Sequence, residues 1–140
     1  MKKKVLIIDD ETSFTNIVKL TLEAKGTYEV CVENDPRNAI NAARTFWPDL
    51  IILDVVMPEL DGGEVHTQLQ ADPVLKHTPV IFLTAIVRKK EVDEHAGMIG
   101  GSFYLAKPVS ADDLMAAMES HSRAKSGLVE QPAPDGVYKV

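Results

Sequence analysis

The sequence predicts an α/β domain in which helices cover both faces of a parallel sheet. Short runs of apolar residues, such as residues 50–53 and 79–83, stand between turn residues. Such a run is typical of a strand that is buried on both faces of a sheet. Segments with helical spacing of apolar residues separate these runs, so that strands and helices alternate five times. This alternation, without a repeat of 20–50 residues, favours a doubly wound sheet.

The N-terminal part of the chain supplies a buried strand, a helix and an edge strand. Residues 5–8 are all apolar and form the first strand. Residues 14–22 carry apolar side chains at helical spacing, and Gly26 ends this helix in the C′ position. Residues 28–33 alternate apolar and polar side chains, which indicates a half-buried edge strand. Cys31 lies within this alternation and is expected to be a small buried residue.

The middle of the chain continues the alternation of helices and strands. Asp35 is expected to cap a second helix whose first turn contains Pro36. The third strand, residues 50–54, is followed by several turn residues, and a third helix opens at Gly62. Residues 79–83 form a fourth apolar strand. The third strand is therefore expected at the centre of the sheet.

The C-terminal part is predicted to complete the sheet and its helices. Residues 88–94 are mostly charged and are expected to form a shorter fourth helix. Residues 102–105 form the fifth strand. Ser110 and Asp113 resemble a capping box at the start of the last helix.

The composition is that of a single globular domain. With 140 residues, 45% hydrophobic and 26% charged, the chain can bury a sizeable core. We expect one domain over residues 1–125. Gly, Pro and short polar residues prevail beyond it, so residues 126–140 are expected to be a C-terminal tail or linker.

Charge and segment lengths exclude several classes of function. The net charge of −6 disfavours direct nucleic acid binding. No apolar stretch reaches membrane-spanning length, and the run that follows Lys4 is too short for a signal peptide. The lone Cys31 rules out an internal disulfide, and the four histidines lack metal-ligand spacing and are expected at the surface. We therefore expect a cytoplasmic protein that binds neither membrane nor nucleic acid.

Chemically active residue types stand where four of the predicted strands end. Asp9 and Asp10 follow the first strand, Asp54 ends the third, Thr84 follows the fourth and Lys107 follows the fifth. In a parallel sheet these positions share the carboxyl edge, where open α/β sheets bind ligands. Three carboxylates together repel one another unless a cation is present, and an oxygen-rich acidic site suits Mg²⁺. With Lys107 and Thr84 beside it, the cluster favours phosphoryl transfer to an aspartate.

Short motifs accompany these residues in a fixed order. They are Asp9-Asp10, Asp54 with Met57-Pro58 and Asp61-Gly62, Thr84-Ala85, and Tyr104 three residues before Lys107-Pro108. The set resembles the receiver domain of two-component response regulators, of the single-domain type similar to chemotaxis regulators. The resemblance covers roughly residues 3–122. No single motif is specific, but motifs in this order at strand ends make a strong signal.

The resemblance implies a flavodoxin-like fold, with a five-stranded parallel sheet of order 2-1-3-4-5 and five helices. It implies that Asp54 is phosphorylated by a sensor histidine kinase or a phosphotransfer protein. Asp10, Asp54 and the carbonyl oxygen of Val56 would bind Mg²⁺ directly, and Asp9 would bind it through water. Mn²⁺ would be an acceptable substitute.

The resemblance also implies roles for residues on the last two strands. Thr84 and Lys107 would act as catalytic groups that bind the phosphoryl oxygens, and the Lys107–Pro108 peptide bond would be cis. Tyr104 matches the family's switch aromatic, which turns inward when Thr84 moves; an ordinary core aromatic is the alternative. The face formed by the fourth helix, fifth strand and fifth helix would bind a downstream target protein or form a homodimer.

Other functions fit the residues less well. A haloacid-dehalogenase-like phosphatase needs a second aspartate two residues after its nucleophile, where this chain has Val56. A flavin or dinucleotide binder needs a phosphate loop after the first strand, where this chain has Asp9-Asp10-Glu11. A module that only binds partners would be expected to lack an acid or the lysine. We expect a phosphorylation-controlled switch rather than a dedicated enzyme; the receiver of a longer regulator, cut before its output domain, is the alternative.

Overall fold

The computed structural model describes residues 2–85, 98–99 and 102–125. Its strands are β1 (Lys3–Ile8), β2 (Tyr28–Glu33), β3 (Leu50–Asp54), β4 (Val80–Thr84), β5 (Met98–Ile99) and β6 (Ser102–Ala106). Its helices are α1 (Thr12–Glu23), α2 (Ala39–Phe46), α3 (Gly62–Ala71) and α5 (Ala111–Lys125), with 3₁₀ turns η1 (Pro36–Asn38) and η2 (Leu75–His77). The fourth helix expected over residues 88–94 and the tail over residues 126–140 lie outside the described residues.

The sheet has the strand order that the family resemblance implies. Its order is β2-β1-β3-β4-β6-β5, and the pairings from β2 to β6 are all parallel. Because β6 is the predicted fifth strand, the order 2-1-3-4-5 is confirmed. The two-residue strand β5 was not predicted and extends the sheet by one antiparallel pairing with β6. Only two residues separate β5 from β6 in the sequence, too few for the crossover that parallel pairing needs.

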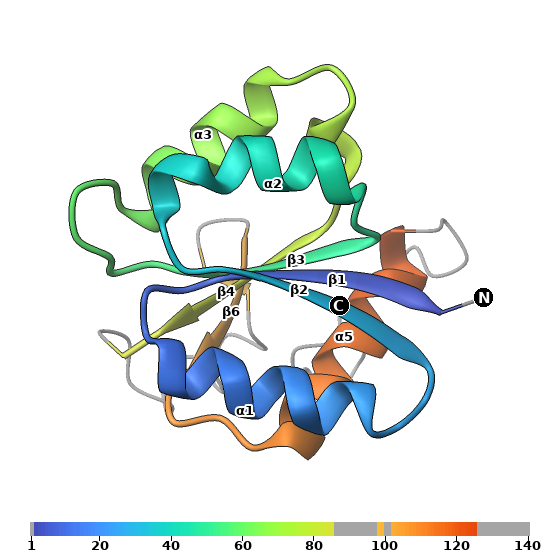
Figure 1. The fold of residues 1–140 in the computed structure, drawn as a ribbon. Helices are drawn as coiled ribbons and strands as arrows, with labels where there is room; N and C mark the ends of the chain where they lie inside the picture. Colours follow the sequence, from blue (N-terminus) through green and yellow to red (C-terminus); the bar gives the residue numbers. More distant parts are fainter. Residues whose placement is uncertain (1, 86–97, 100–101, 126–140) are drawn as a thin grey trace.

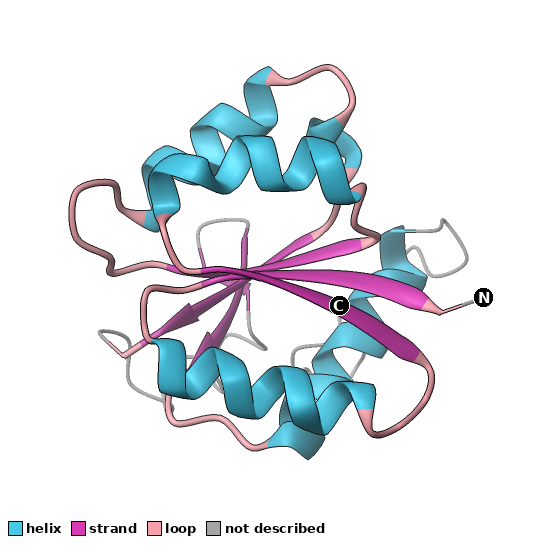
Figure 2. Ribbon diagram, in the orientation of Figure 1, coloured by secondary structure: helices cyan, strands magenta, loops and turns pink. Residues whose placement is uncertain are grey.

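Helices cover both faces of the sheet, as predicted. In Figure 1, α2 and α3 lie on one face, and α1 and α5 lie on the other. Figure 2 shows the strands as a single twisted layer between these pairs of helices. Among the helices of the described segments, none is long and apolar enough to cross a membrane.

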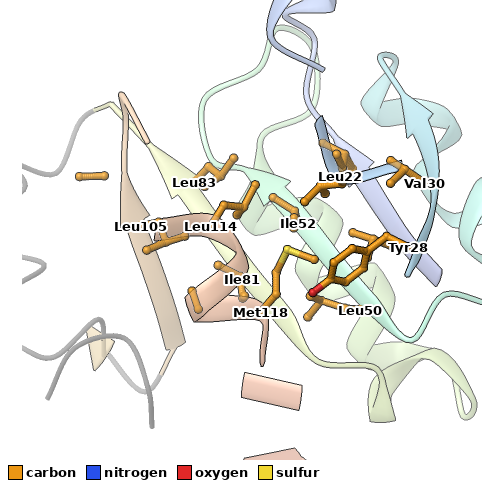
Figure 3. Close-up of a cluster of buried hydrophobic side chains, with 14 residues drawn as sticks. Leu22, Tyr28, Val30, Leu50, Ile52, Ile81, Leu83, Leu105, Leu114 and Met118 are labelled. Carbon is orange, nitrogen blue, oxygen red and sulfur yellow. The ribbon is translucent and has the colours of Figure 1, made fainter. Parts of the chain in front are cut away.

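The core consists of two apolar clusters, one on each face of the sheet. On β1, Val5 and Ile7 belong to the cluster under α1 and α5, whereas Leu6 and Ile8 belong to the cluster under α2 and α3. Strand β3 alternates in the same way, and all its residues are buried. Figure 3 shows the first cluster, with side chains from α5 packed against those of the strands. Burial on both faces explains why these strands are unbroken apolar runs in the sequence.

The two predicted capping residues both accept backbone hydrogen bonds, but Asp35 caps the 3₁₀ turn η1 and not α2, which begins at Ala39. The Asp35 carboxylate accepts a hydrogen bond from the backbone N–H of Arg37 at 2.9 Å, and Pro36 opens the turn η1 that leads into α2. The Ser110 hydroxyl accepts a hydrogen bond from the backbone N–H of Asp113 at 3.0 Å. Both side chains satisfy backbone donors that have no partner within the helix.

Two side chains are placed differently from the sequence expectation. Cys31 is half-buried rather than buried, because β2 is an edge strand of the sheet. It packs against the apolar cluster under α2 and α3. His66 on α3 is half-buried rather than at the surface, because its ring stands edge-on to the ring of Phe82, with centroids 5.1 Å apart. Spacing along the chain could not reveal this cross-element contact.

Gly26 follows the end of α1 in the left-handed region, with φ of 80°, two residues after the C-cap Ala24. It therefore stands one position beyond the predicted C′ site. We expect Gly26→Ala to lower the free energy of unfolding by about 1 kcal/mol, because a Cβ atom is strained at this φ. Crowding adds nothing, since that Cβ would meet no atom within 4 Å. Urea denaturation measures the change, and Gly26→Asn should cost less because Asn tolerates this region; equal losses would contradict the argument.

Candidate functional site

The candidate site lies at the carboxyl edge of the central strands. Asp9 follows β1, Asp54 ends β3, Thr84 ends β4 and Lys107 follows β6. These strands are parallel neighbours, so their ends meet at one edge of the sheet. Asp9 and Thr84 are fully buried and Asp54 is 5% exposed, whereas Asp10 is exposed. The ends of four strands therefore bring together side chains that are far apart in the sequence.

Three carboxylates crowd together at this edge. Asp9, Asp10 and Asp54 each offer an oxygen, and these oxygens all lie within 4.8 Å of one another. Burial, followed by the negative charges of Asp9 and Asp10, raises the pKa of Asp54 from 3.8 to about 6, although Lys107 and the N–H of Val56 oppose the shift. A hard cation would relieve this repulsion, and carboxylate oxygens are its preferred ligands. The donor set therefore fits Mg²⁺.

The ammonium group of Lys107 reaches into the acidic cluster. Its Nζ lies 2.7 Å from Asp9 Oδ2, 3.5 Å from Glu11 Oε1 and 3.7 Å from Asp54 Oδ1. Burial lowers the pKa of Lys107, but the hydrogen bond to Asp9 and the charges of Asp9, Asp54 and Glu11 outweigh burial and raise that pKa above its ordinary value. Lys107 therefore stays charged at neutral pH. The peptide bond from Lys107 to Pro108 is cis.

Hydrogen bonds to its backbone N–H and carbonyl groups hold Asp9 at the site. Its N–H donates to the carbonyl oxygen of Glu33 at 3.1 Å. The amide of Asn34 donates to the carbonyl oxygen of Asp9 at 2.7 Å and to the Thr15 hydroxyl at 3.1 Å. Asn34 thus links the end of β1 to α1, a role that the sequence analysis missed. Its position directly after β2, at the same sheet edge, was the available signal.

Comparison with known families matches the part of the chain that contains all these site residues. The sequence profile of the response regulator receiver domain matches residues 5–119. The chain belongs to this family. The receiver is 37% identical over 121 residues to the alkaline phosphatase synthesis transcriptional regulatory protein PhoP of Bacillus subtilis, with 86% of this chain and 48% of PhoP covered. It therefore spans about half the length of PhoP.

Two further similarities involve proteins that this receiver spans almost completely. It is 33% identical over 121 residues to the polar-differentiation response regulator DivK of Brucella ovis, with 86% of this chain and 97% of DivK covered. Its structure is similar to that of the chemotaxis protein CheY4 of Vibrio cholerae, with a TM-score of 0.73, 30% identity, and 86% and 99% of the two chains covered. As a class, receiver domains are signalling switches with an acidic Mg²⁺ site.

The loop from β3 to α3 follows Asp54 directly. Its last part packs against the end of β3 at Gly62. The N–H of Gly62 donates to the carbonyl oxygen of Val55 at 2.8 Å. A Cβ atom at Gly62 would overlap the carbonyl oxygen of Asp54 and lie 2.8 Å from Val55 Cα. Asp61 and Glu64 form a capping box at this helix start, which the sequence analysis had not identified. Glycine is thus required where α3 touches the end of β3.

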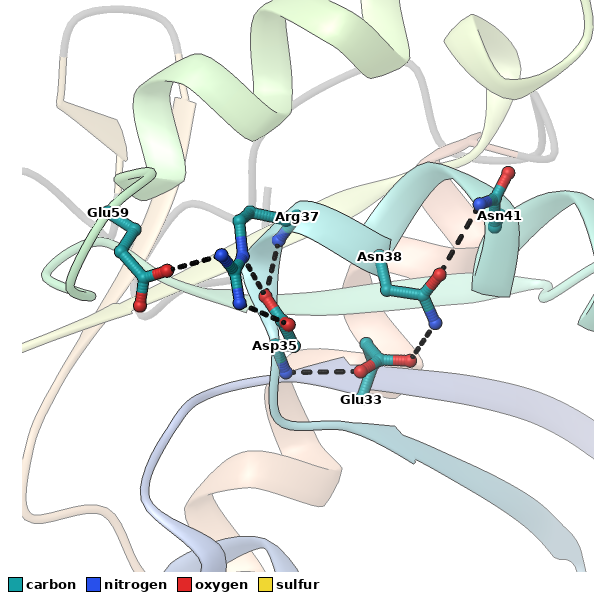
Figure 4. A network of polar contacts seen from close by, with 6 residues as sticks. All are labelled: Glu33, Asp35, Arg37, Asn38, Asn41 and Glu59. Carbon is teal, nitrogen blue, oxygen red and sulfur yellow. Dashed lines mark hydrogen bonds and ion pairs between the residues drawn. The ribbon is translucent and has the colours of Figure 1, made fainter.

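An arginine ties this loop to the loop before α2. Arg37 Nη1 lies 2.8 Å from Glu59 Oε2, and Arg37 Nη2 lies 3.0 Å from Asp35 Oδ2 (Figure 4). Glu59 has a positive φ of 71°, unusual for a residue with a Cβ atom. All three side chains are largely exposed, so these ion pairs add little stability. Their geometric effect is to restrain the loop that carries Val56, whose side chain is 54% exposed.

Tyr104 on β6 belongs to a row of three aromatic rings. Its ring stacks on the ring of Phe82, with centroids 5.0 Å apart and an interplanar angle of 20°. The third ring, that of His66, also contacts Phe82. Tyr104 itself is half-buried. Phe82 and Thr84 are two residues apart on β4 and therefore face the same side of the sheet. The three rings therefore lie next to the end of β4, where Thr84 belongs to the candidate site.

The raised pKa of Asp54 makes stability depend on pH. Because the folded pKa lies above the unfolded one, the contribution of Asp54 to stability is greatest at low pH and is lost as pH rises through about 6. Without metal, we expect Asp54→Asn to raise the melting temperature by about 2–5 °C at pH 8, and by less at pH 5.

Asp72→Asn provides the control for this pH series. Backbone N–H groups of Leu75 and Val74 hold the pKa of Asp72 below its ordinary value, so the loss of this carboxylate should lower the melting temperature. Thermal denaturation followed by circular dichroism measures both variants. An equal effect of Asp54→Asn at pH 5 and at pH 8 would contradict the assignment of the raised pKa.

Proposed function

We propose that this receiver is a switch in which Asp54 accepts a phosphoryl group from the phosphohistidine of a sensor histidine kinase or a phosphotransfer protein. One observation carries the proposal: the Asp54 carboxylate lies at the carboxyl edge of the sheet, beside Asp9 and Asp10 and 3.7 Å from the Lys107 ammonium group. A nucleophile, a cation site and a positive charge for the incoming phosphoryl group are thus adjacent. Family membership supports the same chemistry.

In the proposed reaction an oxygen of Asp54 attacks the phosphorus atom. The bond between phosphorus and the histidine nitrogen breaks, and the nitrogen keeps the electron pair. The Thr84 hydroxyl and the Lys107 ammonium group bind the phosphoryl oxygens, over which the negative charge is spread. Positioning and charge neutralisation provide the rate enhancement. The position of Lys107 next to both Asp9 and Asp54 supports its part in this step.

We further propose a ligand set for Mg²⁺ or Mn²⁺. Asp10, Asp54 and the carbonyl oxygen of Val56 bind the ion directly, and Asp9 binds it through water. When bound, the ion neutralises charge on the phosphoryl group. The oxygens of the three aspartates, within 4.8 Å of one another, support this set. The backbone N–H of Val56 lowers the pKa of Asp54, which supports the placement of Val56 beside them.

The output side of the proposal involves Tyr104. A displacement of Thr84 toward a phosphoryl group would change the packing beside Phe82 and so the ring row that contains Tyr104. Such couplings are typically worth about 1–3 kcal/mol, which is enough to shift populations. A downstream target protein or a second copy is proposed to read the change on the face of β6 and α5. The cytoplasmic location expected from the sequence stays a prediction.

Phosphorylation of Asp54 can be tested with a small donor. Incubation with acetyl phosphate and Mg²⁺, followed by peptide mapping by mass spectrometry, should place one added phosphoryl group on Asp54. Asp54→Asn should remain unlabelled, whereas the control Asp112→Asn, an exposed change on α5, should label like the native chain. Equal labelling of Asp54→Asn and the native chain would refute the proposed site.

Metal binding can be tested through stability. A cation at tenfold excess over its dissociation constant stabilises the fold by about 1.4 kcal/mol, so millimolar Mg²⁺ should raise the melting temperature by a few degrees. Asp10→Ala should abolish this rise, because Asp10 is a proposed ligand. Asp112→Ala should keep it. Differential scanning fluorimetry measures the shifts, and an identical response of native chain and Asp10→Ala would exclude Asp10 as a ligand.

A further inference from the structure

We infer that Phe14 positions Lys107 for phosphoryl transfer by holding its ammonium group against the face of an aromatic ring. The Nζ atom of Lys107 lies over the Phe14 ring, 4.6 Å from its centroid. This distance is within the range of cation–π attraction. The catalytic part of this inference rests on the function proposed above, whereas the contact itself does not.

The surroundings of Lys107 make this contact effective. Its side chain is only 15% exposed, and cation–π attraction strengthens when the cation is withdrawn from water. Asp9 accepts a short hydrogen bond from Nζ, at 2.7 Å, while Glu11 Oε1 lies 3.5 Å from Nζ and the Glu11 side chain is 59% exposed. The Phe14 ring supplies an uncharged partner to the same ammonium group.

Two of the three carboxylate partners of Lys107, Asp9 and Asp54, change their state during the proposed reaction. Asp9 and Asp54 lie in the cluster that fits a metal ion, and Asp54 is the proposed phosphoryl acceptor. A cation bound to these carboxylates weakens their hold on Lys107, because they then share their charge. The ring of Phe14 neither titrates nor binds metal. It therefore keeps the ammonium group near Asp54 when the Asp9 ion pair weakens.

Packing alone is the competing explanation for Phe14. The residue is half-buried on α1 and packs against the apolar cluster under α1 and α5. Val18, one turn along the same helix, packs against the same cluster. A packing role predicts that any apolar side chain of similar size suffices at position 14. A positioning role predicts that an aromatic face is required.

The contact is tested by NMR without any phosphoryl donor. Ring currents should move the Lys107 Hε signals upfield in the native chain, with the signals assigned by their loss in Lys107→Met. Phe14→Tyr should keep the upfield shift, and Phe14→Leu should remove it. Unshifted Lys107 signals in the native chain would overturn the inference.

The catalytic role is tested by rates of phosphorylation with acetyl phosphate and Mg²⁺. Phe14→Leu should be roughly five- to tenfold slower than the native chain, the factor expected for loss of a partly desolvated cation–π contact. Phe14→Tyr should stay within about twofold, because it keeps the ring. In a Lys107→Met background, Phe14→Leu should cause no further loss. Val18→Ala is the packing control, and it should lower stability while leaving the rate unchanged.

The outcomes separate this inference from the proposed function. Equal rates for Phe14→Leu and Phe14→Tyr would overturn the inference, as would an undiminished effect of Phe14→Leu in the Lys107→Met background. A native chain that acquires no phosphoryl group would instead refute the proposed function, and with it any role of Phe14 in transfer. The NMR shift would still decide whether Phe14 holds Lys107.

Discussion

Charge crowding at the carboxyl edge is the constraint on which the site depends. Three carboxylate oxygens lie within 4.8 Å of one another, and two of these residues are almost fully removed from solvent. Water screens the charges of these two buried carboxylates poorly, so cations must compensate them. Lys107 provides part of this compensation through its contacts with Asp9 and Asp54. The remaining repulsion is a physical reason for the site to bind a divalent ion and to respond when the charge at Asp54 changes.

The backbone around the site is built to keep these charges in place. Asn34 bonds the carbonyl oxygen of Asp9, so the end of β1 is fixed through a residue of the neighbouring loop. Gly62 lets the start of α3 touch the backbone of Asp54 without a Cβ atom between them. Neither residue carries charge or takes part in the proposed chemistry. Their contribution is a rigid frame, which electrostatic catalysis requires because misplaced groups must otherwise reorganise during the reaction.

Strand β4 connects the site with the surface that we propose for output. Thr84 stands at its end, and Phe82, two residues earlier, supports the ring of Tyr104 on the next strand. Closely packed rings do not deform continuously, so a shift at one end favours a discrete change at the other. His66 extends the same row to α3. The half-buried position of His66 thus has a physical reason in ring packing, where spacing in the sequence had suggested only a surface histidine.

The sequence by itself predicted the five parallel strands, the chemically active residues at their carboxyl ends and the carboxylates of the site. Apolar runs and turn residues are local signals, and a parallel sheet then brings the ends of those runs to one edge. Family resemblance supplied the strand order. Only the tertiary structure decided that Lys107 lies nearer to Asp9 than to Asp54, that Phe14 underlies its ammonium group, and that Asn34 holds Asp9. Asp9 and Lys107 are 98 residues apart, so their contact depends on side-chain distances between separate elements, which no local pattern encodes.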